Sequence, residues 1–353
     1  MKKYNNKNFY GKFTSGASFF NSNKKFFHKK NIKYFNYQLK KNLKKMKLTE
    51  KEINNKIVMD VGSGRQALAF LPLNPKKIYH YDISYLNIKR FNKFIRKNKI
   101  GDKIISKQLD LTRNKLPKKK FDFIYLHGII QHTERVNVAI ENLCSSLKVN
   151  GSMWFYFYRP GSLHVFLGSV QRKLIKDNNI NIKKFYSYVK RKKLGFNFID
   201  SIMDDCFVPI RQLFYPSDYR KFLSNNSCHV FGNTFVTKYG NNVNFLKYHQ
   251  SATFFVKKNI NTPSKKDNLL RRGYSVNVLD KNLYYKEKNI QLLLKMIKQA
   301  NYENKSDIID LIIFIEKIKN IITKEFLKDH SLNKKKYINF IKILNNRIAK
   351  NDK

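Results

Sequence analysis

The sequence predicts an α/β protein built on a doubly wound, mostly parallel sheet. Short apolar segments of strand length alternate with longer segments of helical periodicity, which is typical of βαβ units. The first apolar segment, residues 56–61, runs directly into the turn Gly62-Ser63-Gly64. Aspartates stand at or near the carboxyl ends of three successive expected strands, where open α/β sheets bind their ligands.

The turn after the first strand is the clearest sign of a ligand site. Gly62 and Gly64 permit positive φ and lack Cβ atoms, so main-chain amides can approach a group bound at the start of the next helix. With Ala67 the turn also fits the pattern G-x-G-x-x-A. That pattern alone is weak evidence for a dinucleotide site, because a strand-turn-helix without a ligand satisfies it equally well.

Asp60 is the unusual residue of this strand. A carboxylate among buried positions costs desolvation free energy unless a cationic group meets it. A nicotinamide-binding fold normally has an apolar residue here, because its pyrophosphate is an anion. Asp60 therefore favours a ligand with an ammonium or sulfonium group.

The next three expected strands also end in polar residues. The second strand, residues 77–83, carries Asp82 about 20 residues beyond the glycines, the distance expected of a carboxylate that binds ribose hydroxyls. The third and fourth strands, residues 104–109 and 121–126, lead into Asp110 and His127.

In this order the segments resemble the motifs of the class I S-adenosylmethionine-dependent methyltransferases, specifically their type 11 group of small-molecule enzymes. The resemblance covers residues 56–258. It rests on five segments: DVGSG (60–64), YHYDIS (79–84), QLDLT (108–112), FDFIYLHGIIQHT (121–133) and LKVNGSMWFYFYRPGS (147–162).

The resemblance implies a Rossmann-like, seven-stranded sheet whose last strand is antiparallel, with S-adenosylmethionine as cofactor. It places the methionine moiety near Asp60, the glycine turn and His127, the ribose at Asp82, and the adenine edge at Asp110. The cofactor-binding residues it implies are Asp60, Gly62, Ser63, Gly64, Asp82, Ile83, Asp110, Leu111 and His127. Ser63 stands where the family often has cysteine, and Val149-Asn150-Gly151 replaces Pro-Gly-Gly. Neither change removes a ligand-contacting side chain.

Helices are expected on both sides of the strands. The first 30 residues show no sustained periodicity and are expected to form a flexible arm within a basic N-terminal region, residues 1–55. Within that region Phe35, Leu39, Leu43 and Met46 have helical spacing, with lysines on the other faces. Such a helix could lie on an anionic membrane; we favour ordinary packing on the sheet, because the family has such a helix. Further helices are expected over residues 66–70, 85–97 and 133–147, with Asp122 a structural acid at a strand start.

Residues 159–212 interrupt the expected fold, because a compact unit passes from strand to helix in a few residues. By resemblance this insertion is a helical lid over the substrate. Its acids Asp204 and Asp205 indicate either specific contacts or a helix cap. A helix start at residues 215–219 and strands near 230–237 and 252–256 complete the methyltransferase domain.

A C-terminal helical extension, residues 262–353, follows a linker that begins near Asn261. Helical periodicity recurs over residues 290–297, 308–322 and 337–348. The resemblance does not reach this part. We expect an appendage that serves as an oligomerisation or partner surface.

The composition is strongly basic. The 353 residues include 72 Lys and Arg against 24 Asp and Glu, a formal charge of +48. This charge attracts nucleic acid, anionic membrane or acidic substrates nonspecifically. Because codon bias toward A and T would also enrich lysine, together with Asn, Ile, Phe and Tyr, a functional and a purely compositional origin both stay open.

The cysteines and the apolar segments predict a cytoplasmic protein. Cys144, Cys206 and Cys228 have no close spacing, so the sequence suggests neither a disulfide framework nor a C-x-x-C metal site. The first 13 residues lack the apolar core of a signal peptide. The longest apolar stretch, residues 308–315, is short and contains an aspartate.

The expected reaction moves a methyl group to a small-molecule acceptor by in-line displacement. Because the leaving group is a neutral thioether, the protein mainly supplies alignment and desolvation. A phenol or carbon-acid acceptor needs a base, and His127 and His132 are the candidates, although His132 fits a helix start better. The alternatives are a methyltransferase that acts on RNA or another nucleic acid and a non-catalytic binding protein. Residues 127–130 lack the Asn-Pro-Pro-Tyr segment of amino-methylating DNA enzymes, which argues against exocyclic base amines.

Overall fold

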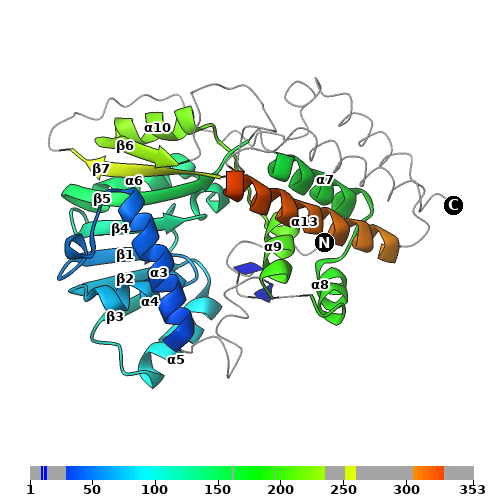
Figure 1. The fold of residues 1–353 in the computed structure, drawn as a ribbon, viewed down its shortest axis with the longest axis horizontal. Coiled ribbons are helices and arrows are strands. Elements are labelled where there is room, and N and C mark those ends of the chain that lie inside the picture. The colour runs from blue at the N-terminus through cyan, green and yellow to red at the C-terminus, as the bar shows by residue number, and fades with distance from the viewer. Residues whose placement is uncertain are drawn as a thin grey trace. The chain divides into compact units, whose positions relative to one another are not determined.

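The structure is a computed structural model that describes residues 9–10, 12–13, 29–160, 163–194, 196–234, 251–259 and 305–329. These residues fall into two compact units, each with its own core (Figure 1). The first unit contains the described residues up to Tyr158 together with 209–234 and 252–259. The second contains the described parts of 159–208 and 305–329.

The first unit is a seven-stranded sheet in the order β3-β2-β1-β4-β5-β7-β6. The paired strands β1 to β5 are parallel, while β6 and β7 are antiparallel to each other. The strands are β1 (Ile57–Val61), β2 (Lys77–Asp82), β3 (Ile104–Gln108), β4 (Phe121–His127), β5 (Leu147–Tyr158), β6 (Cys228–Thr234) and β7 (Ser251–Lys258). The predicted fold class, a doubly wound α/β sheet with an antiparallel last strand, is confirmed.

Helices connect the parallel strands, since each parallel crossover needs a covering element. The helices of this unit are α3 (Lys29–Lys45), η1 (Glu50–Glu52), α4 (Arg65–Phe70), η2 (Leu71–Leu73), α5 (Tyr85–Lys97), η3 (Ile130–His132), α6 (Val136–Ser146) and α10 (Pro216–Asn225); α3 and η1 precede β1, and α10 precedes β6. Asp218 caps α10 by accepting the Tyr215 N–H at 3.0 Å, as the predicted helix start requires.

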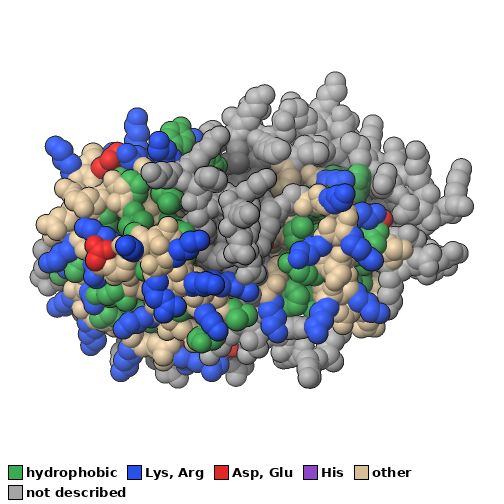
Figure 2. All heavy atoms as spheres, turned by 90° about the horizontal axis from the view of Figure 1, so that it is seen from below, with side chains coloured by type: hydrophobic (Ala, Val, Ile, Leu, Met, Phe, Trp, Pro, Cys, Tyr) green, Lys and Arg blue, Asp and Glu red, His purple; other side chains and the backbone are tan. Residues whose placement is uncertain are grey.

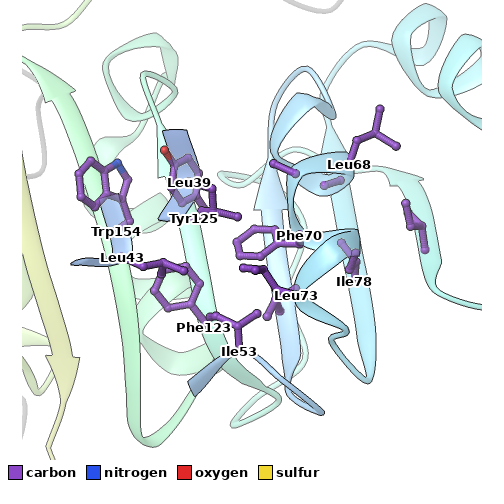
Figure 3. Close-up of a cluster of buried hydrophobic side chains, with 14 of the residues drawn as sticks. Leu39, Leu43, Ile53, Leu68, Phe70, Leu73, Ile78, Phe123, Tyr125 and Trp154 are labelled. Atoms are coloured by element: carbon purple, nitrogen blue, oxygen red, sulfur yellow. The ribbon is translucent and has the colours of Figure 1, made fainter. Parts of the chain in front are cut away.

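The core between α3 and the sheet explains the lysine-flanked apolar stripe. Leu39 and Leu43 are 2% exposed and pack with Phe70, Phe123 and the aromatic residues of β4 and β5 (Figure 3). Asn36 and Asn42 add polar contacts, to the Ala69 carbonyl and the Tyr125 hydroxyl. The stripe therefore packs on the sheet, as an ordinary structural helix does.

Several predicted boundaries shift. The helix predicted over residues 133–147 begins only at Val136, because η3 and an extended Thr133 come first, and Leu147 already pairs with Phe121 as part of β5. β3 ends at Gln108 and β6 begins at Cys228, and residues 235–237 lie outside the described ranges.

Two other expectations about this unit meet different outcomes. Asp122 is structural as expected: it accepts the Ile57 N–H and the Lys148 ammonium, both at 2.9 Å. The prediction of a flexible arm is wrong for the few N-terminal residues that the structure describes, because Phe9 and Phe13 are buried. The rest of the arm up to residue 28 lies outside the described residues.

The second unit is helical. It consists of α7 (Leu163–Asp177), α8 (Ile182–Arg191), α9 (Phe196–Phe207) and α13 (Lys305–Asp329). The insertion and a C-terminal helix thus share one core, to which Ile308, Leu311 and Ile315 contribute. The helices expected over residues 290–297 and 337–348 lie outside the described residues.

A buried ionic cluster joins the helices of this unit. The Lys319 ammonium of α13 donates to the Glu316 carboxylate at 2.6 Å, to Gln171 Oε1 of α7 at 2.9 Å, and to the Asp205 carboxylate of α9. His164 of α7 also lies 3.4 Å from Asp205. Asp205 is therefore an internal ion-pair partner, and the interpretation of a cap for the following helix is wrong, since it lies within α9.

Across the described ranges, no helix combines the length and apolarity needed to cross a membrane. Nor do His, Cys, Asp and Glu side chains gather there as a metal site.

We predict that Lys319→Ala destabilises the helical unit by about 3–5 kcal/mol, because it leaves two carboxylates buried without their counter-ion. The matched control is Lys317→Ala, since Lys317 is exposed on the same helix. Urea unfolding followed by far-UV circular dichroism measures both variants. Equal losses of stability would show that the buried cluster does not hold the unit together.

Candidate functional site

The carboxyl ends of four neighbouring parallel strands meet at one edge of the sheet. Because β2, β1, β4 and β5 are adjacent and parallel, they bring Asp82, the glycine turn, His127 and Tyr158 to the same edge. This is the edge at which open α/β sheets bind ligands.

The turn after β1 requires glycine at two positions. Gly62 has φ +123° and Gly64, the residue before α4, has φ +80°. A Cβ on Gly62 would lie 2.9 Å from Ile129 Cδ1, and a Cβ on Gly64 would lie 3.2 Å from the Phe91 ring. Backbone conformation and close packing thus both exclude a side chain at Gly62 and at Gly64. Ser63, between the two glycines, is half-buried.

Two buried side chains hold this turn in place. Asp60 accepts the Ala67 N–H at 3.0 Å and so ties β1 to α4. His80 Nε2 lies 2.7 Å from the Gly62 carbonyl oxygen, and its Nδ1 lies 2.9 Å from Ser106 Oγ. Because a carbonyl only accepts, Nε2 carries the proton and Nδ1 accepts the hydroxyl hydrogen. Burial lowers the pKa of His80 to about 4, so the ring is neutral.

Burial raises the pKa of both strand-end acids, Asp60 and Asp82, to about 7. The hydrogen bond from Ala67 opposes this shift at Asp60, while the charge of Asp82 adds to it. At Asp82 the bonds from Ser84 and Asn87 oppose the shift. The two acids are therefore poised to change charge near neutral pH, and a ligand that prefers the ionised form would favour proton loss.

Asp82 is organised by the start of α5. The Ser84 N–H donates to Asp82 Oδ1 at 2.7 Å, and Asn87 Nδ2 donates to Oδ2 at 2.9 Å. Asn87 is buried and its Oδ1 has no hydrogen-bond partner. Ile83 is half-buried, and its carbonyl accepts Gln108 Nε2 at 2.9 Å. Acceptor atoms of Asp82 and Asn87 thus lie next to each other at the end of β2.

Asp110 and Leu111 follow β3 in a local turn. The Thr112 N–H and hydroxyl donate to Asp110 Oδ1 at 2.9 and 2.7 Å, and Arg113 Nε lies 3.6 Å from Oδ2. Leu111 is buried and its carbonyl accepts Asn142 Nδ2 at 2.7 Å. Asp110 therefore already has cationic and hydroxyl partners within its own loop.

The two candidate catalytic histidines occupy different environments. His127, the last residue of β4, stacks on Tyr156 with ring centroids 4.1 Å apart and keeps an exposed edge. Desolvation of the ring lowers the pKa of His127, and the positive charge of Arg65 acts in the same direction. His127 is thus a neutral, flat surface and a weak base at neutral pH.

His132 is buried and contacts three segments that are distant in the sequence. Its Nδ1 donates to the Ile210 carbonyl at 2.9 Å, and its ring packs edge-on against Tyr10 and Tyr158, 5.9 and 6.1 Å away. It ends η3 and does not begin a helix, so the helix-start interpretation is wrong. Only residues 159–208 of the predicted insertion belong to the second unit, and Tyr158 and Ile210 flank this segment, so His132 contacts both of its ends.

Gln131 is a residue that sequence reasoning missed. Its side chain is fully buried, and both amide atoms, Nε2 and Oε1, lack hydrogen-bond partners. It lies beside Gly128, whose φ is +68°: a Cβ there would meet Gln131 Nε2 at 3.6 Å and the Tyr156 ring at 3.8 Å. The Gln131 amide and the His127–Tyr156 ring pair therefore flank one point at the end of β4.

Residues 59–155 match a protein-family model described as a methyltransferase domain. This match covers β1 to β5 and the loops just described, and the strand order is the one that the sequence resemblance implies. The chain contains a class I S-adenosylmethionine-dependent methyltransferase domain. No curated protein matches the chain.

Solved structures with some likeness to the chain include three bacterial or algal proteins. The YcgJ protein of Bacillus subtilis is 13% identical, with 65% of this chain and 100% of that chain covered, at TM-score 0.43. Magnesium protoporphyrin IX methyltransferase of Synechocystis is 14% identical, with 65% and 86% covered, at 0.40. A sarcosine dimethylglycine methyltransferase candidate from Galdieria sulphuraria is 12% identical, with 57% of this chain and 61% of that chain covered, at TM-score 0.36. The chain thus spans about three fifths of that protein.

S-adenosylmethionine is the cofactor of this methyltransferase domain, and the residues present fit it. The unpartnered Asn87 Oδ1 and the Asp82 carboxylate offer acceptors to ribose hydroxyls, and the glycine turn gives close access to backbone. Asp60, Ser63, Ile83, Asp110, Leu111 and His127 lie at the same strand ends, and their individual roles stay predictions.

Three useful residues of the methyltransferase domain were not predicted. His80 could have been suspected as a polar residue within an otherwise buried strand. Asn87 follows Asp82 by five positions, on the buried side of α5. Gln131 has no signal in the sequence, because its burial depends on how the loop after β4 folds.

We predict that Asp82→Asn weakens S-adenosylhomocysteine binding by about 2 kcal/mol, on the order of 30-fold, because a charge-assisted acceptor is lost. The wild-type affinity should rise with pH between about 6 and 8, since the free protein loses the Asp82 proton near pH 7 and the carboxylate accepts better. Asp82→Asn should reduce this rise to the part that Asp60 contributes, since the pKa of Asp60 is also about 7. Isothermal titration calorimetry measures both effects.

The matched control for this prediction is Asp102→Asn, an exposed aspartate just before β3. It should bind like the wild type at every pH. A wild-type affinity that falls with rising pH, or an Asp82→Asn variant of unchanged affinity, would contradict the ribose assignment.

Proposed function

We propose that the protein transfers the methyl group of S-adenosylmethionine to a small-molecule acceptor bound at the carboxyl ends of β4 and β5. The observation that carries this proposal is Gln131, whose buried amide has no hydrogen-bond partner for either polar atom. The bound cofactor supplies a sulfonium methyl group, and the chain's task is to align an acceptor with it.

The energetic cost of Gln131 favours a ligand. A buried amide without partners costs about 1–3 kcal/mol per unsatisfied group, so a core position without a function gains from an apolar residue. An acceptor that offers both a hydrogen-bond donor and an acceptor, such as a hydroxyl or an amide, would relieve this cost. Gln131 would then orient the acceptor beside Gly128.

The stacked rings of His127 and Tyr156, next to Gln131, favour a compact molecule as the methyl acceptor. The His127 and Tyr156 rings are nearly parallel and stacked, with 4° between their planes, and His127 is exposed. His127 serves better as a stacking ring than as a base, because its lowered pKa makes the imidazole a weak base. The His132 Nδ1 proton is engaged with Ile210, so a base role for His132 would fall to its Nε2.

The insertion remains the proposed lid. The chain leaves the first unit at Tyr158 and returns at Pro209, and both ends lie at the strand edge that carries Gln131. Two further hydrogen bonds fix this return: Gln212 N–H donates to the Gln131 carbonyl at 2.7 Å, and Gln212 Nε2 donates to the Glu134 carbonyl at 3.0 Å.

A nucleic-acid substrate is the alternative, and the described residues of the face drawn in Figure 2 do not favour it. Figure 2 shows Lys and Arg side chains scattered over the drawn face among apolar and other polar groups. A phosphate track would call for a continuous basic stripe. The segment His127-Gly128-Ile129-Ile130 also lacks the amide and aromatic residues that amino-methylating DNA enzymes use.

The test is methyl transfer from S-adenosylmethionine labelled in its methyl group. We expect the label to enter a compound in a filtrate of cell extract from which macromolecules have been removed, and not total RNA. Gln131→Leu should abolish this transfer while S-adenosylhomocysteine affinity stays within a few fold. The control Gln38→Leu, at a half-buried position on α3, should transfer at the wild-type rate.

Two results would contradict the proposal. Label that enters RNA, with tight and structure-selective RNA binding at physiological salt, would favour the nucleic-acid alternative; nonspecific attraction weakens steeply with salt. A Gln131→Leu variant with full transfer to the labelled compound would remove Gln131 from the acceptor site.

A further inference from the structure

The side of α3 that faces away from the sheet carries two exposed aromatic rings. Tyr34 and Tyr37 are 58% and 62% exposed, while Leu39 and Leu43 on the opposite side are buried in the core. Because residues three apart are neighbours on a helix, the two rings form one patch. Exposed large hydrophobic side chains number five in the described part of the chain, so two of them in one patch indicate an interaction surface.

Three exposed lysines complete this side of the helix. They stand four residues before Tyr37 and four and seven residues after it, which places them on the same side of α3. Among the described residues these three lysines form no ion pair with an acid, whereas Lys40 pairs with Glu50 at 2.6 Å. The outer face of α3 thus consists of Lys33, Tyr34, Tyr37, Lys41 and Lys44.

The sequence around this helix is more one-sided in charge than the rest of the chain. Residues 1–49 contain 14 lysines and no arginine, aspartate or glutamate, so all 24 acids of the protein follow at residue 50 or later. A bias in overall composition would spread the acids along the whole chain. The local excess of positive charge therefore favours a partner that carries many negative charges.

We propose that the outer face of α3 binds the surface of an anionic lipid bilayer. Lysine ammonium groups are attracted to anionic headgroups, and tyrosine rings, which are apolar with a polar tip, settle at the level of the headgroups. The apolar stripe of α3 packs on the sheet, so the helix docks by its charged and aromatic side and does not insert.

The residue types and the shape of the face favour a bilayer over a nucleic acid. Nucleic-acid recognition relies strongly on arginine, whose planar guanidinium binds phosphates and base edges through paired hydrogen bonds, and this face has lysine alone. Proteins that bind single strands hold them in a groove, whereas α3 lies on the outside of the unit, across the strands of the sheet (Figure 1). The candidate site lies at the carboxyl edge of the sheet, so this inference does not depend on the methyl acceptor.

The experiment mixes full-length protein with vesicles and measures co-sedimentation at physiological salt. Vesicles of phosphatidylcholine and phosphatidylserine at a ratio of about 2:1 should bind the protein, and vesicles of phosphatidylcholine alone should not. Replacing the three lysines together, by Lys33→Gln, Lys41→Gln and Lys44→Gln, should weaken binding at least about tenfold, since each lysine near an anionic surface contributes up to roughly fivefold.

The matched control removes the same charge from the second unit, by Lys183→Gln, Lys184→Gln and Lys190→Gln at exposed positions of α8. This variant should bind the anionic vesicles nearly as well as the wild type, because charges away from the contact are screened by salt. Equal losses in the two triple variants would show attraction by net charge alone and would overturn the proposal.

A fluorescence measurement locates the contact. The chain has a single tryptophan, Trp154, which is 3% exposed. Phosphatidylserine vesicles with brominated acyl chains should quench the additional emission of the Tyr37→Trp variant and leave the wild-type emission unchanged. A Tyr37→Trp variant that binds these vesicles without quenching would contradict the proposal. So would binding of single-stranded RNA that requires the three lysines, in the absence of vesicle binding.

Discussion

The hydrogen bond from neutral His80 to the Gly62 carbonyl is the constraint on which the site depends. A turn with two positive-φ glycines has many alternatives in solution, and His80 and Asp60 restrict it from two sides. His80 is itself fixed by Ser106 of β3, so three adjacent strands determine one turn. The turn then sets where α4 begins and how closely Ile129 of the loop after β4 can approach.

The sequence was sufficient for features that depend on local pattern. Strand-length apolar runs, helical spacing and strand-end acids predict the sheet and place Asp60, Asp82 and His127 at one edge. It was insufficient where burial comes from tertiary contact. Asp205 looks like a cap in the sequence but pairs with Lys319, which lies far along the chain. His132 looks like a helix start, yet its ring nitrogen binds the carbonyl of Ile210, far along the chain.

The second unit changes how the insertion should be understood. In the sequence the insertion and the C-terminal extension look like separate additions, because no short-range pattern connects them. The structure gives them one core and one buried ionic cluster, with Lys319 of α13 held between α7 and α9. Removing residues 159–208 alone would therefore expose the apolar and ionic face of α13, so the insertion and α13 have to be considered together.

The central claim is that the strand-end acids and the glycine turn form an S-adenosylmethionine site. Calorimetric titration of the full-length protein with S-adenosylhomocysteine and, separately, with NADH tests it most directly, because both ligands contain an adenosine. The account predicts saturable binding of S-adenosylhomocysteine at one site per chain and no binding of NADH. Binding of NADH without binding of S-adenosylhomocysteine would contradict it.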